Sequence, residues 1–506
     1  MRPIMTVFRS PSAWRAAPAV ALCALLAGCM VGPDYHAPAL ALTPAFHTPQ
    51  PAPAPAPAAQ TATLDGWWAA FGDPGLVTVV QRAAAQNLDL AQAHARLVQS
   101  RAAARAAGAA LLPVADGAGS AAAGRQSLNG PLGEIGRHLP GYPRDYDDYA
   151  LNAEASWEID LFGGLRRERQ AAVADARATR VQAEAVRIAV EADAADAYLQ
   201  VRAYQARLGV AHRQETVRQD LVALLKRLNG EGVSPERELH EAEAELEAVR
   251  AVIPPLTTGL VGQLNRLDVL MGAQPGTYRA ELTAGGPLPA PPTLATIMTP
   301  ADLLRRRPDV VVAEQRLIAA NARIGAAIAD YYPKVSIQAL FGVDSLESSH
   351  VFAGDAMQRQ IAAGFRWRLF DFGRIDAEVA AAKGRDAEAL AAYRLAVLRA
   401  AEDVENAFTS LTQDELQAAA LDRQIAELTT SRRQAEQAYE GGVVSLIEVR
   451  DADRDLLNAS DQLAQAQAGA ARAAVASYRA LGGGWIVGEP RPARLAANAA
   501  ASPRGE

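Results

Sequence analysis

The chain has 506 residues and a formal net charge of -7 at pH 7; half of its residues are hydrophobic, but only 6% are aromatic. A chain of this length does not form one compact core unless it is elongated, and an alanine-rich apolar content favours long, closely packed helices. The acidic balance argues against nucleic acid as a partner. Beyond the N-terminus, no uncharged apolar run of roughly 18 residues predicts a helix that crosses a bilayer.

The first 28 residues (1–28) are predicted to form an export signal. Three arginines give a basic region, and the apolar stretch from Ala16 to Ala27 is too short to span a membrane as a mature helix. The run Leu26-Ala27-Gly28-Cys29 resembles the bacterial lipobox, in which the cysteine becomes the lipidated first residue. We therefore expect a covalent lipid on Cys29; the alternative is an ordinary signal peptide with a chance cysteine. Cleavage would remove three arginines and no acid, which changes the net charge from -7 to -10.

Residues 29–64 are interpreted as a tether between this lipid anchor and the folded body. The segment from Gln50 to Gln60 alternates proline with alanine, which favours extended polyproline geometry and cannot join a core. At the other end, residues 489–506 are expected to form a flexible tail.

Between these ends the chain repeats itself. Trp157–Gly164 reads WEIDLFGG and is echoed by Trp367–Arg374, WRLFDFGR; the glycine-rich run Gly230–Ser234 is echoed by Gly441–Ser445. The matching runs are about 210 to 220 residues apart and stand in the same order, which indicates a duplicated unit. We place the first helix-strand-strand-helix repeat at residues 65–285 and the second at 286–488.

Each repeat is predicted to contain a helical hairpin of unusual length. Asp73-Pro74 and Thr299-Pro300 provide helix starts at the head of the two repeats. The proline-free segments Arg166–Leu228 and Asp376–Tyr439 would each be about 95 Å long as helices, far longer than ordinary globular helices. Glycines then end each long helix, and Ser234-Pro235-Glu236 supplies a cap, a proline and an acid for the next one.

Alternation of apolar and polar residues predicts strands. The odd positions of Tyr149–Leu161, Val335–Val343 and Ile361–Leu369 are apolar, whereas the even positions are largely polar or charged. Each run is close to the roughly 9 to 11 residues of a tilted membrane strand. The repeat also predicts a strand after Pro113, although its alternation is poor. A soluble sheet with one wet face is the alternative, but the charged polar face and the very long helices favour a membrane sheet.

Four strands per chain cannot close a barrel, and lipid does not tolerate open strand edges. A dimer would give eight strands, which side chains would fill, and a trimer would give twelve, which can leave a lumen. Charged even positions require water, so we favour the trimer. The predicted fold is an α+β membrane protein with very long helical hairpins and a transmembrane β-barrel of four strands per chain, closed as a 12-stranded trimer.

The sequence predicts no enzyme and no metal site. The seven histidines are scattered, and His240-Glu241 lacks a second histidine one helical turn on. Gly482-Gly483-Gly484 is not followed by the Lys-Ser/Thr of a phosphate loop, and no Gly-x-Ser-x-Gly elbow is present.

Motifs spread over residues 30–490 point in combination to one family. They are Cys29 with Val31-Gly32-Pro33-Asp34-Tyr35, Trp67-Trp68 with Phe71-Gly72-Asp73, Trp157–Gly163, Arg306-Arg307-Pro308-Asp309-Val310 with Ala313-Glu314, Asn321 with Ile324-Gly325-Ala326, Tyr332-Pro333, and Leu369–Arg374. With these motifs the chain resembles the outer membrane factors of tripartite efflux pumps, the TolC-like channels, in the lipoprotein branch called NodT-type.

The resemblance implies a homotrimeric, passive exit duct in the outer membrane, in which a long α-helical coiled-coil barrel extends from the 12-stranded β-barrel into the periplasm. A periplasmic adaptor (membrane-fusion protein) would join it to an inner-membrane transporter of RND or MFS type, and the cargo would be drugs or other small toxic compounds. It implies no cofactor apart from the lipid on Cys29. Type I protein secretion and metal-ion efflux are alternative systems. A lipid-anchored periplasmic coiled-coil scaffold without a channel is the alternative class.

The resemblance also assigns a periplasmic gate. Channels of this family close just after the turn of the second repeat, where the matching residues are Ile447, Glu448, Asp451 and Arg454. Three copies of Asp451 near one axis would form an acidic ring that attracts cations, and Arg454 could pair with an acid on a neighbouring helix. The alternative is a solvated helix face, because residues 451–455 form a charge-rich run.

Three further groups of residues are assigned. The expected adaptor-docking tips are the two turns, whose glycines plain turn chemistry also explains: Gly230, Gly232, Val233 and Ser234, and Gly441, Gly442, Val443, Val444 and Ser445. The even-numbered residues expected to face the barrel lumen are Glu154, Glu158, Arg366 and Arg368. Arg306-Arg307-Pro308-Asp309 is predicted to have a structural role. Pro308 and Asp309 suit a helix start, and the arginines would pair with acids near the helical barrel.

Overall fold

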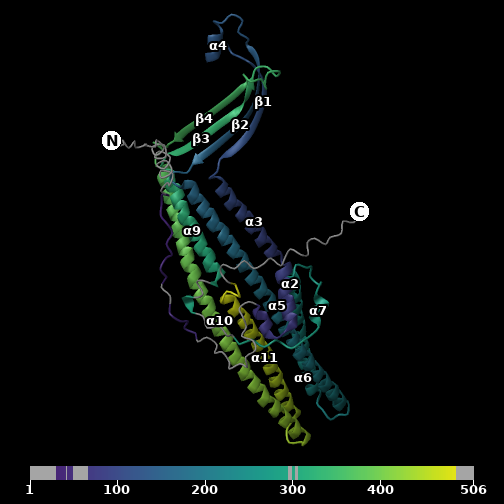
Figure 1. Ribbon diagram of the computed structural model, residues 1–506. Coiled ribbons are helices and arrows are strands. Elements are labelled where there is room, and N and C mark those ends of the chain that lie inside the picture. Colours follow the sequence, from purple (N-terminus) through teal and green to yellow (C-terminus); the bar gives the residue numbers. More distant parts are fainter. Residues whose placement is uncertain (1–29, 41–42, 49–65, 294–298, 302–305, 486–506) are drawn as a thin grey trace, which may run out of the picture. The chain divides into compact units, whose positions relative to one another are not determined.

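The computed structural model describes residues 30–40, 43–48, 66–293, 299–301 and 306–485 (Figure 1). The predicted signal, Cys29, the Pro-Ala run and the C-terminal tail lie outside the described residues. The described part divides into two compact units. The first lies within the ranges up to Pro38, Val98–Arg177 and Glu314–Ala391, and the second within Ala39–Leu97, Ala178–Ala313 and from Ala392 onward. Because each unit takes residues from both predicted repeats, the repeat bounds given above stay predictions.

Helices of equal length recur in the two halves of the sequence. The pairs are α3 (Leu88–Ala109) and α9 (Pro308–Ala329) with 22 residues each, α5 (Gly164–Gly230) and α10 (Arg374–Glu440) with 67, and α6 (Glu236–Leu270) and α11 (Leu446–Ala480) with 35. The shorter helices are η1 (Trp67–Phe71), α2 (Pro74–Gln86), α4 (Pro131–Gly136) and α7 (Arg279–Thr283). Among the helices of the described ranges, none is both long and apolar enough to cross a membrane.

The first unit contains one antiparallel sheet of four strands in chain order (Figure 1). Its strands are β1 (Val114–Arg125), β2 (Asp145–Ile159), β3 (Lys334–Ser345) and β4 (Met357–Arg366). The strand expected after Pro113 only from the repeat is therefore present. β1 and β4 are the two edges, and each pairs on one side only.

The strand register separates an apolar face from a polar one. Trp157 lies opposite Ile337, so the odd-numbered apolar residues of neighbouring strands share one face. Asp116 lies opposite Glu154 on the other face. Several large side chains of the apolar face are exposed in the single chain: Leu151, Phe341, Ile361 and Phe365. An apolar surface of this kind marks contact with lipid or with another protein.

β4 ends earlier than the sequence predicts. The alternating pattern continues to Leu369, but the last paired residue is Arg366, opposite Lys334. Arg368 therefore lies beyond the sheet, and strand pairing within this chain does not set which face it occupies. β4 has a neighbour only on its β3 side, so nothing on its other side holds the end of the strand.

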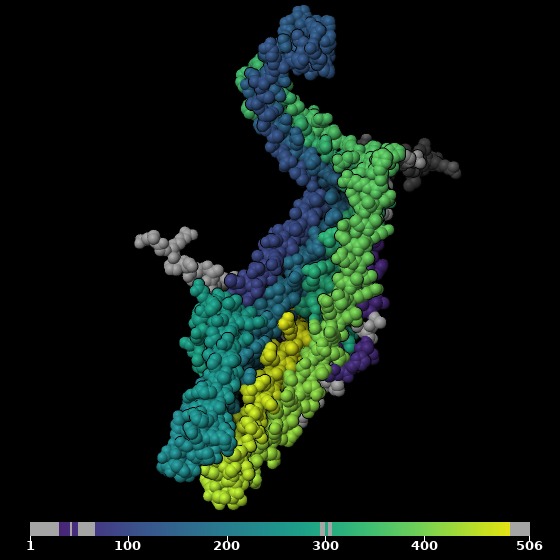
Figure 2. Space-filling view, turned by 180° about the vertical axis from the view of Figure 1, so that it is seen from behind, coloured from purple at the N-terminus to yellow at the C-terminus, as the bar shows by residue number. Residues whose placement is uncertain are grey.

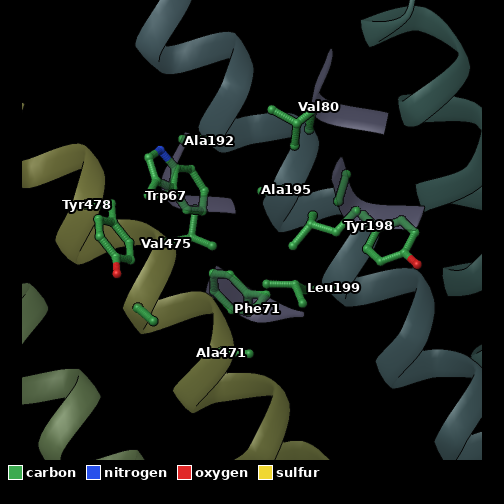
Figure 3. Close-up of a cluster of buried hydrophobic side chains, with 14 of the residues drawn as sticks. Trp67, Phe71, Val80, Ala192, Ala195, Tyr198, Leu199, Ala471, Val475 and Tyr478 are labelled. Carbon is green, nitrogen blue, oxygen red and sulfur yellow. The ribbon is translucent and has the colours of Figure 1, made fainter. Parts of the chain in front are cut away.

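The second unit is built around a buried aromatic and alanine-rich cluster (Figure 3). Trp67 of η1 stacks on Tyr478 of α11, with ring centroids 5.1 Å apart, and packs edge-on against Phe71 at 6.1 Å. Leu199 of α5 and Ala471 of α11 are fully buried beside them. The cluster therefore joins residues more than 400 positions apart in the sequence. Its small alanine side chains let the helices approach closely.

Asp73 caps the helix that leads into this cluster and also binds Tyr198. Its carboxylate accepts hydrogen bonds from the amides of Gly75 and Leu76 at 2.7 and 3.2 Å, which confirms the predicted cap of α2. The Tyr198 hydroxyl donates to the same carboxylate at 2.8 Å and accepts from Arg202 at 2.7 Å. Burial raises the pKa of Tyr198 to about 12, so this hydroxyl stays protonated and can donate.

An extended N-terminal segment is held within the first unit. Arg167 of α5 donates to the carbonyls of Val31 and Gly32 at 3.2 Å and to the Asp34 carboxylate at 2.9 Å. Gly32 has a φ of 90° and lies against Gly325 of α9 so closely that a Cβ at residue 32 would collide with it. The motifs around Gly32 and Gly325 are therefore parts of one contact, which accounts for a signature that the sequence alone left unexplained.

Candidate channel gate and docking tips

Both hairpin turns in the second unit end their long helix in the same way. Gly232 and Gly442 have φ values of 74° and 71°, in the left-handed region that favours glycine. The amide of the next residue, Val233 or Val443, donates to the carbonyl five positions earlier at 2.8 and 2.9 Å. Each glycine amide donates to the carbonyl three positions earlier at 2.9 Å. These pairs of bonds are the Schellman motif, which closes a helix end with a rigid turn.

The valine side chains of these turns are unusually exposed to solvent. Val233 is 69% exposed and Val443 80%, although a hydrophobic residue at this position often packs back onto its helix. The two turns lie at the same end of the second unit and form adjacent parts of its surface (Figure 2). A pair of rigid turns that present apolar side chains suits contact with a protein partner.

Ser234 does not cap α6 as predicted. α6 begins after Pro235, and the Ser234 hydroxyl is hydrogen-bonded to the Glu238 carboxylate at 3.0 Å. Ser445 precedes α11, but its side chain makes no capping bond. The start of each second helix therefore depends on the turn itself and on the acids of its first turn.

The predicted gate residues share one exposed face of α11. Ile447, Glu448, Asp451 and Arg454 recur at helical spacing, and all four are exposed. Arg454 pairs with Asp451 at 3.0 Å and lies 3.5 Å from Asp455. The expected partner on a neighbouring helix is therefore not found within the described chain, where Arg454 pairs along α11 itself.

α11 is also tied to the α5–α6 hairpin, by ion pairs that the sequence analysis missed. The Arg450 side chain, 11% exposed, pairs with Glu245 of α6 and lies 3.9 Å from Glu241. Arg218 of α5 approaches the same Glu245 carboxylate at 3.2 Å. Arg450 and Glu245 are 205 positions apart in sequence, so no local spacing reveals their contact.

Further ion pairs continue these ties. They are Arg432 of α10 with Asp453 at 2.9 Å, Arg207 of α5 with Asp461 at 2.7 Å, and Arg472 of α11 with Asp196 at 2.6 Å. Together they tie α11 to α5 and α10 along its length, and near the turn Asp451 pairs with Arg454 of the same helix.

The other predicted site residues divide between the two units. Glu154, Glu158 and Arg366 lie on the polar face of the sheet, whereas Arg368 follows the end of β4. Arg307 pairs with Asp309 at 2.6 Å and with Asp403 at 2.8 Å. These ion pairs confirm the prediction that Arg307 has a structural role. In the ranges that the structure covers, no group of three or more His, Cys, Asp or Glu side chains is placed to hold a metal ion.

Comparison with known proteins gives a consistent result. A family model described as outer membrane efflux protein matches residues 79–273 and 299–483. The chain is 31% identical over 432 residues to the pyoverdine export outer membrane protein OpmQ of Pseudomonas putida, covering 85% of this chain and 91% of that protein. It is 27% identical over 462 residues to the cation efflux system protein CusC of Escherichia coli, covering 91% and 96%. A solved structure of the outer-membrane channel OprN matches with a TM-score of 0.80 at 32% identity, covering 90% of this chain and 100% of that one.

Proposed function

The chain belongs to the outer membrane efflux protein family, and on this premise we propose that it is the exit duct of a tripartite efflux pump of RND or MFS type and acts as a homotrimer. The observation that carries the proposal is the four-stranded sheet, which has one apolar face and two unpaired edges. Such a sheet needs lipid on one side, water on the other and further strands at both edges. Three copies supply twelve strands, enough to close a barrel with a water-filled lumen.

The polar face of the sheet would line that lumen. Glu154, Glu158 and Arg366 lie on it among amides and hydroxyls, a mixed surface that water and small polar or amphipathic solutes can wet. Transport is then passive, because the duct only has to let cargo pass. The expected cargo is drugs or other small toxic compounds delivered by an inner-membrane transporter.

The exposed face of α11 would form the gate at the periplasmic end. In a trimer, three copies of Asp451 would stand near one axis and create a negative potential that attracts cations and repels anions. Ile447 and Arg454, on the same face, would narrow the opening. The Arg450–Glu245 pair ties α11 to its own chain, so its release would be one step in opening.

The two hairpin tips are the proposed docking site of the periplasmic adaptor. Val233 and Val443 offer apolar contacts on turns that the Schellman bonds hold in shape. Replacing Val443 with aspartate would place a charge in this contact without touching the gate. Cys29 is proposed to carry the lipid that directs the chain to the outer membrane.

Conductance in planar lipid bilayers tests the gate. We expect Asp451→Ala to raise the single-channel conductance and to lower the preference for cations, because it removes the acidic ring. Asp451→Glu, which keeps the charge, should retain the cation preference of the unaltered channel. Unchanged conductance and selectivity in Asp451→Ala would remove Asp451 from the gate.

Cation export is a second candidate, because one relative is named as a cation efflux protein. Expression in a strain that lacks its own exit ducts separates the two. Restored tolerance to drugs and solvents supports the first proposal. Restored tolerance to transition-metal salts alone supports the second.

A further inference from the structure

A cleft of about 630 Å³ lies between the N-terminal segment, α5 and α9, entirely within the first unit. Val173 of α5 and Ile318 of α9 give it an apolar part. Its charged lining residues are four arginines and a single acid: Arg166, Arg167, Arg169, Arg177 and Asp34. A cleft of this size can hold a ligand, and the excess of positive charge favours an anion.

Two of the four arginines are used within the chain, and two are not. Arg166 pairs with Asp160 at 3.1 Å, and the buried Arg167 pairs with Asp34 at 2.9 Å. Arg169 and Arg177 are exposed, and neither has an ion-pair or hydrogen-bond partner among the residues that the structure describes. They stand roughly two helical turns apart on one face of α5. Two guanidinium groups are therefore left for an external anion.

The internal duplication shows that a helix of this kind does not need these arginines for packing. α5 and α10 both have 67 residues, and a shift of 210 residues aligns them together with Trp157 and Trp367. The residues of α10 that align with the four arginines are Asp376, Ala377, Val379 and Ala387. α10 forms the same long helix with no basic residue at any of these positions, so Arg169 and Arg177 call for another role.

The N-terminal segment indicates where the cleft lies relative to the membrane. The Val31 amide donates to the carbonyl of Phe162 at 3.1 Å. Met30 packs so closely on Gly163 that a Cβ there would collide with it. Met30 directly follows Cys29, the predicted site of lipid attachment. With a lipid on Cys29 and the sheet in the membrane, the β2–α5 junction lies at the periplasmic surface of the outer membrane, on the outside of the barrel.

Arg169 lies at the depth of the lipid headgroups below this junction. It is five residues beyond Gly164, the first residue of α5, which corresponds to about 8 Å along the helix. Its side chain is also 3.9 Å from where a Cβ on Gly108 would stand, near the end of α3. The headgroup region of a bilayer is roughly 5 to 8 Å deep on each side. Helical side chains tilt toward the N-terminus, here toward the sheet, so Arg177 extends its charge toward Arg169.

We propose that this cleft binds an anionic phospholipid of the periplasmic leaflet. Arg169 donates to the lipid phosphate, Arg177 adds positive charge below it, and Val173 and Ile318 contact the carbon atoms of the headgroup. A zwitterionic headgroup binds less well, because its own cation repels the two unpaired arginines. The inference rests on the proposed barrel, which places the junction at the membrane surface. A dissolved phosphate offers the same chemistry, so the test has to separate the two sources.

Native mass spectrometry of the full-length channel in detergent measures binding. The protein is titrated separately with phosphatidylglycerol, with phosphatidylcholine and with inorganic phosphate. We expect phosphatidylglycerol to bind about tenfold more tightly than phosphatidylcholine, and Arg169→Gln/Arg177→Gln to lose this preference. Folding should be unaffected, because neither arginine has a partner among the described residues.

Two variants separate the cleft from a general attraction between charges. Arg180→Gln/Arg213→Gln removes the same charge from exposed positions of α5 that do not line the cleft, and should keep the preference. An equal loss in both double variants would overturn the site. Val173→Trp keeps all four arginines but fills the cleft, so it should weaken binding of phosphatidylglycerol. Normal binding by Val173→Trp would place the lipid elsewhere and overturn the proposal.

The remaining outcomes concern the source of the phosphate and the channel itself. Binding of inorganic phosphate that requires Arg169 and Arg177, without any preference between the two lipids, would assign the arginines to a dissolved anion and overturn the lipid site. Arg169→Gln/Arg177→Gln should conduct like the unaltered channel in planar bilayers. A chain that conducts but does not prefer phosphatidylglycerol overturns this inference alone. A chain that prefers phosphatidylglycerol but never conducts supports the site and overturns the proposed function.

Discussion

At the residue scale, Arg307 shows how one side chain can fasten three helices. It lies just before α9, pairs with Asp403 of α10 and donates to the carbonyl of Ala480, the last residue of α11, at 3.3 Å. The side chain is only 10% exposed. Burial alone would lower the pKa of Arg307, but the hydrogen bonds and charges of Asp309 and Asp403 raise it, so the guanidinium stays charged.

We expect Arg307→Ala to destabilise the fold by roughly 2 kcal/mol, because several hydrogen bonds to a charged group are lost while its partners keep some access to water. Arg307→Lys should recover only part of this, since a lysine cannot reproduce the planar fork. Thermal unfolding followed by circular dichroism measures the effect. Arg306→Ala, one position earlier, is the control; equal unfolding temperatures for the two alanine variants would contradict the assigned role.

At the element scale, the position of α11 depends on ion pairs that join it to the neighbouring α5–α6 hairpin. We expect Arg450→Ala to raise the open probability of the channel, because Glu245 and Glu241 can no longer hold α11 against the α5–α6 hairpin. Single-channel recordings and uptake of a bulky antibiotic measure opening. Arg250→Ala, which breaks exposed pairs with Glu215 of α5 and Glu247 of α6 but none with α11, should change neither. Equal opening in both variants would show that the Arg450 contact does not restrain the gate.

A second prediction concerns the segment 43–48, which lies along α10. The amides of His47 and Thr48 donate to the Glu405 carboxylate at 2.7 and 2.8 Å. Slight burial opposes ionisation, but these bonds hold the pKa of Glu405 below its ordinary value of 4.5. A lowered pKa means that the stabilisation is present at neutral pH and is lost as the pH falls through the folded-state value.

Hydrogen exchange of the His47 and Thr48 amides should therefore be slower than in Glu405→Ala at pH 7. The difference should vanish once the pH is well below 4.5. A difference that persists in acid would show that other contacts hold the segment.

How far the sequence predicts each element depends on whether the element is determined locally. α5 and α10 were predicted to within two residues at each end, because long proline-free segments between glycine turns leave few alternatives. β1 has no useful alternation, since alanine and glycine occupy both of its faces, and only the duplication predicted it. Arg450 was missed because its partner lies on another hairpin. The end of β4 was misjudged because alternation of side chains does not show where strand pairing stops, which is at Arg366.

At the scale of the whole molecule, two devices would hold the protein in the outer membrane. A closed barrel would bury its apolar face in lipid over the whole circumference, whereas a lipid on Cys29 would insert only a few acyl chains. The barrel should therefore dominate retention, and the lipid should serve mainly delivery and assembly. A lipid anchor alone would not account for the exposed apolar side chains on one face of the sheet: Leu151, Phe341, Ile361 and Phe365.

This argument predicts the behaviour of Cys29→Ala placed behind an ordinary export signal. The variant should no longer incorporate a labelled fatty acid, yet its trimers should resist extraction from the membrane by high salt and alkali. Unaltered protein treated in the same way is the reference. Release of the variant as a soluble protein without detergent would contradict the barrel and favour a lipid-tethered periplasmic scaffold, because the exposed face of the sheet would then have to be covered by protein and not by lipid.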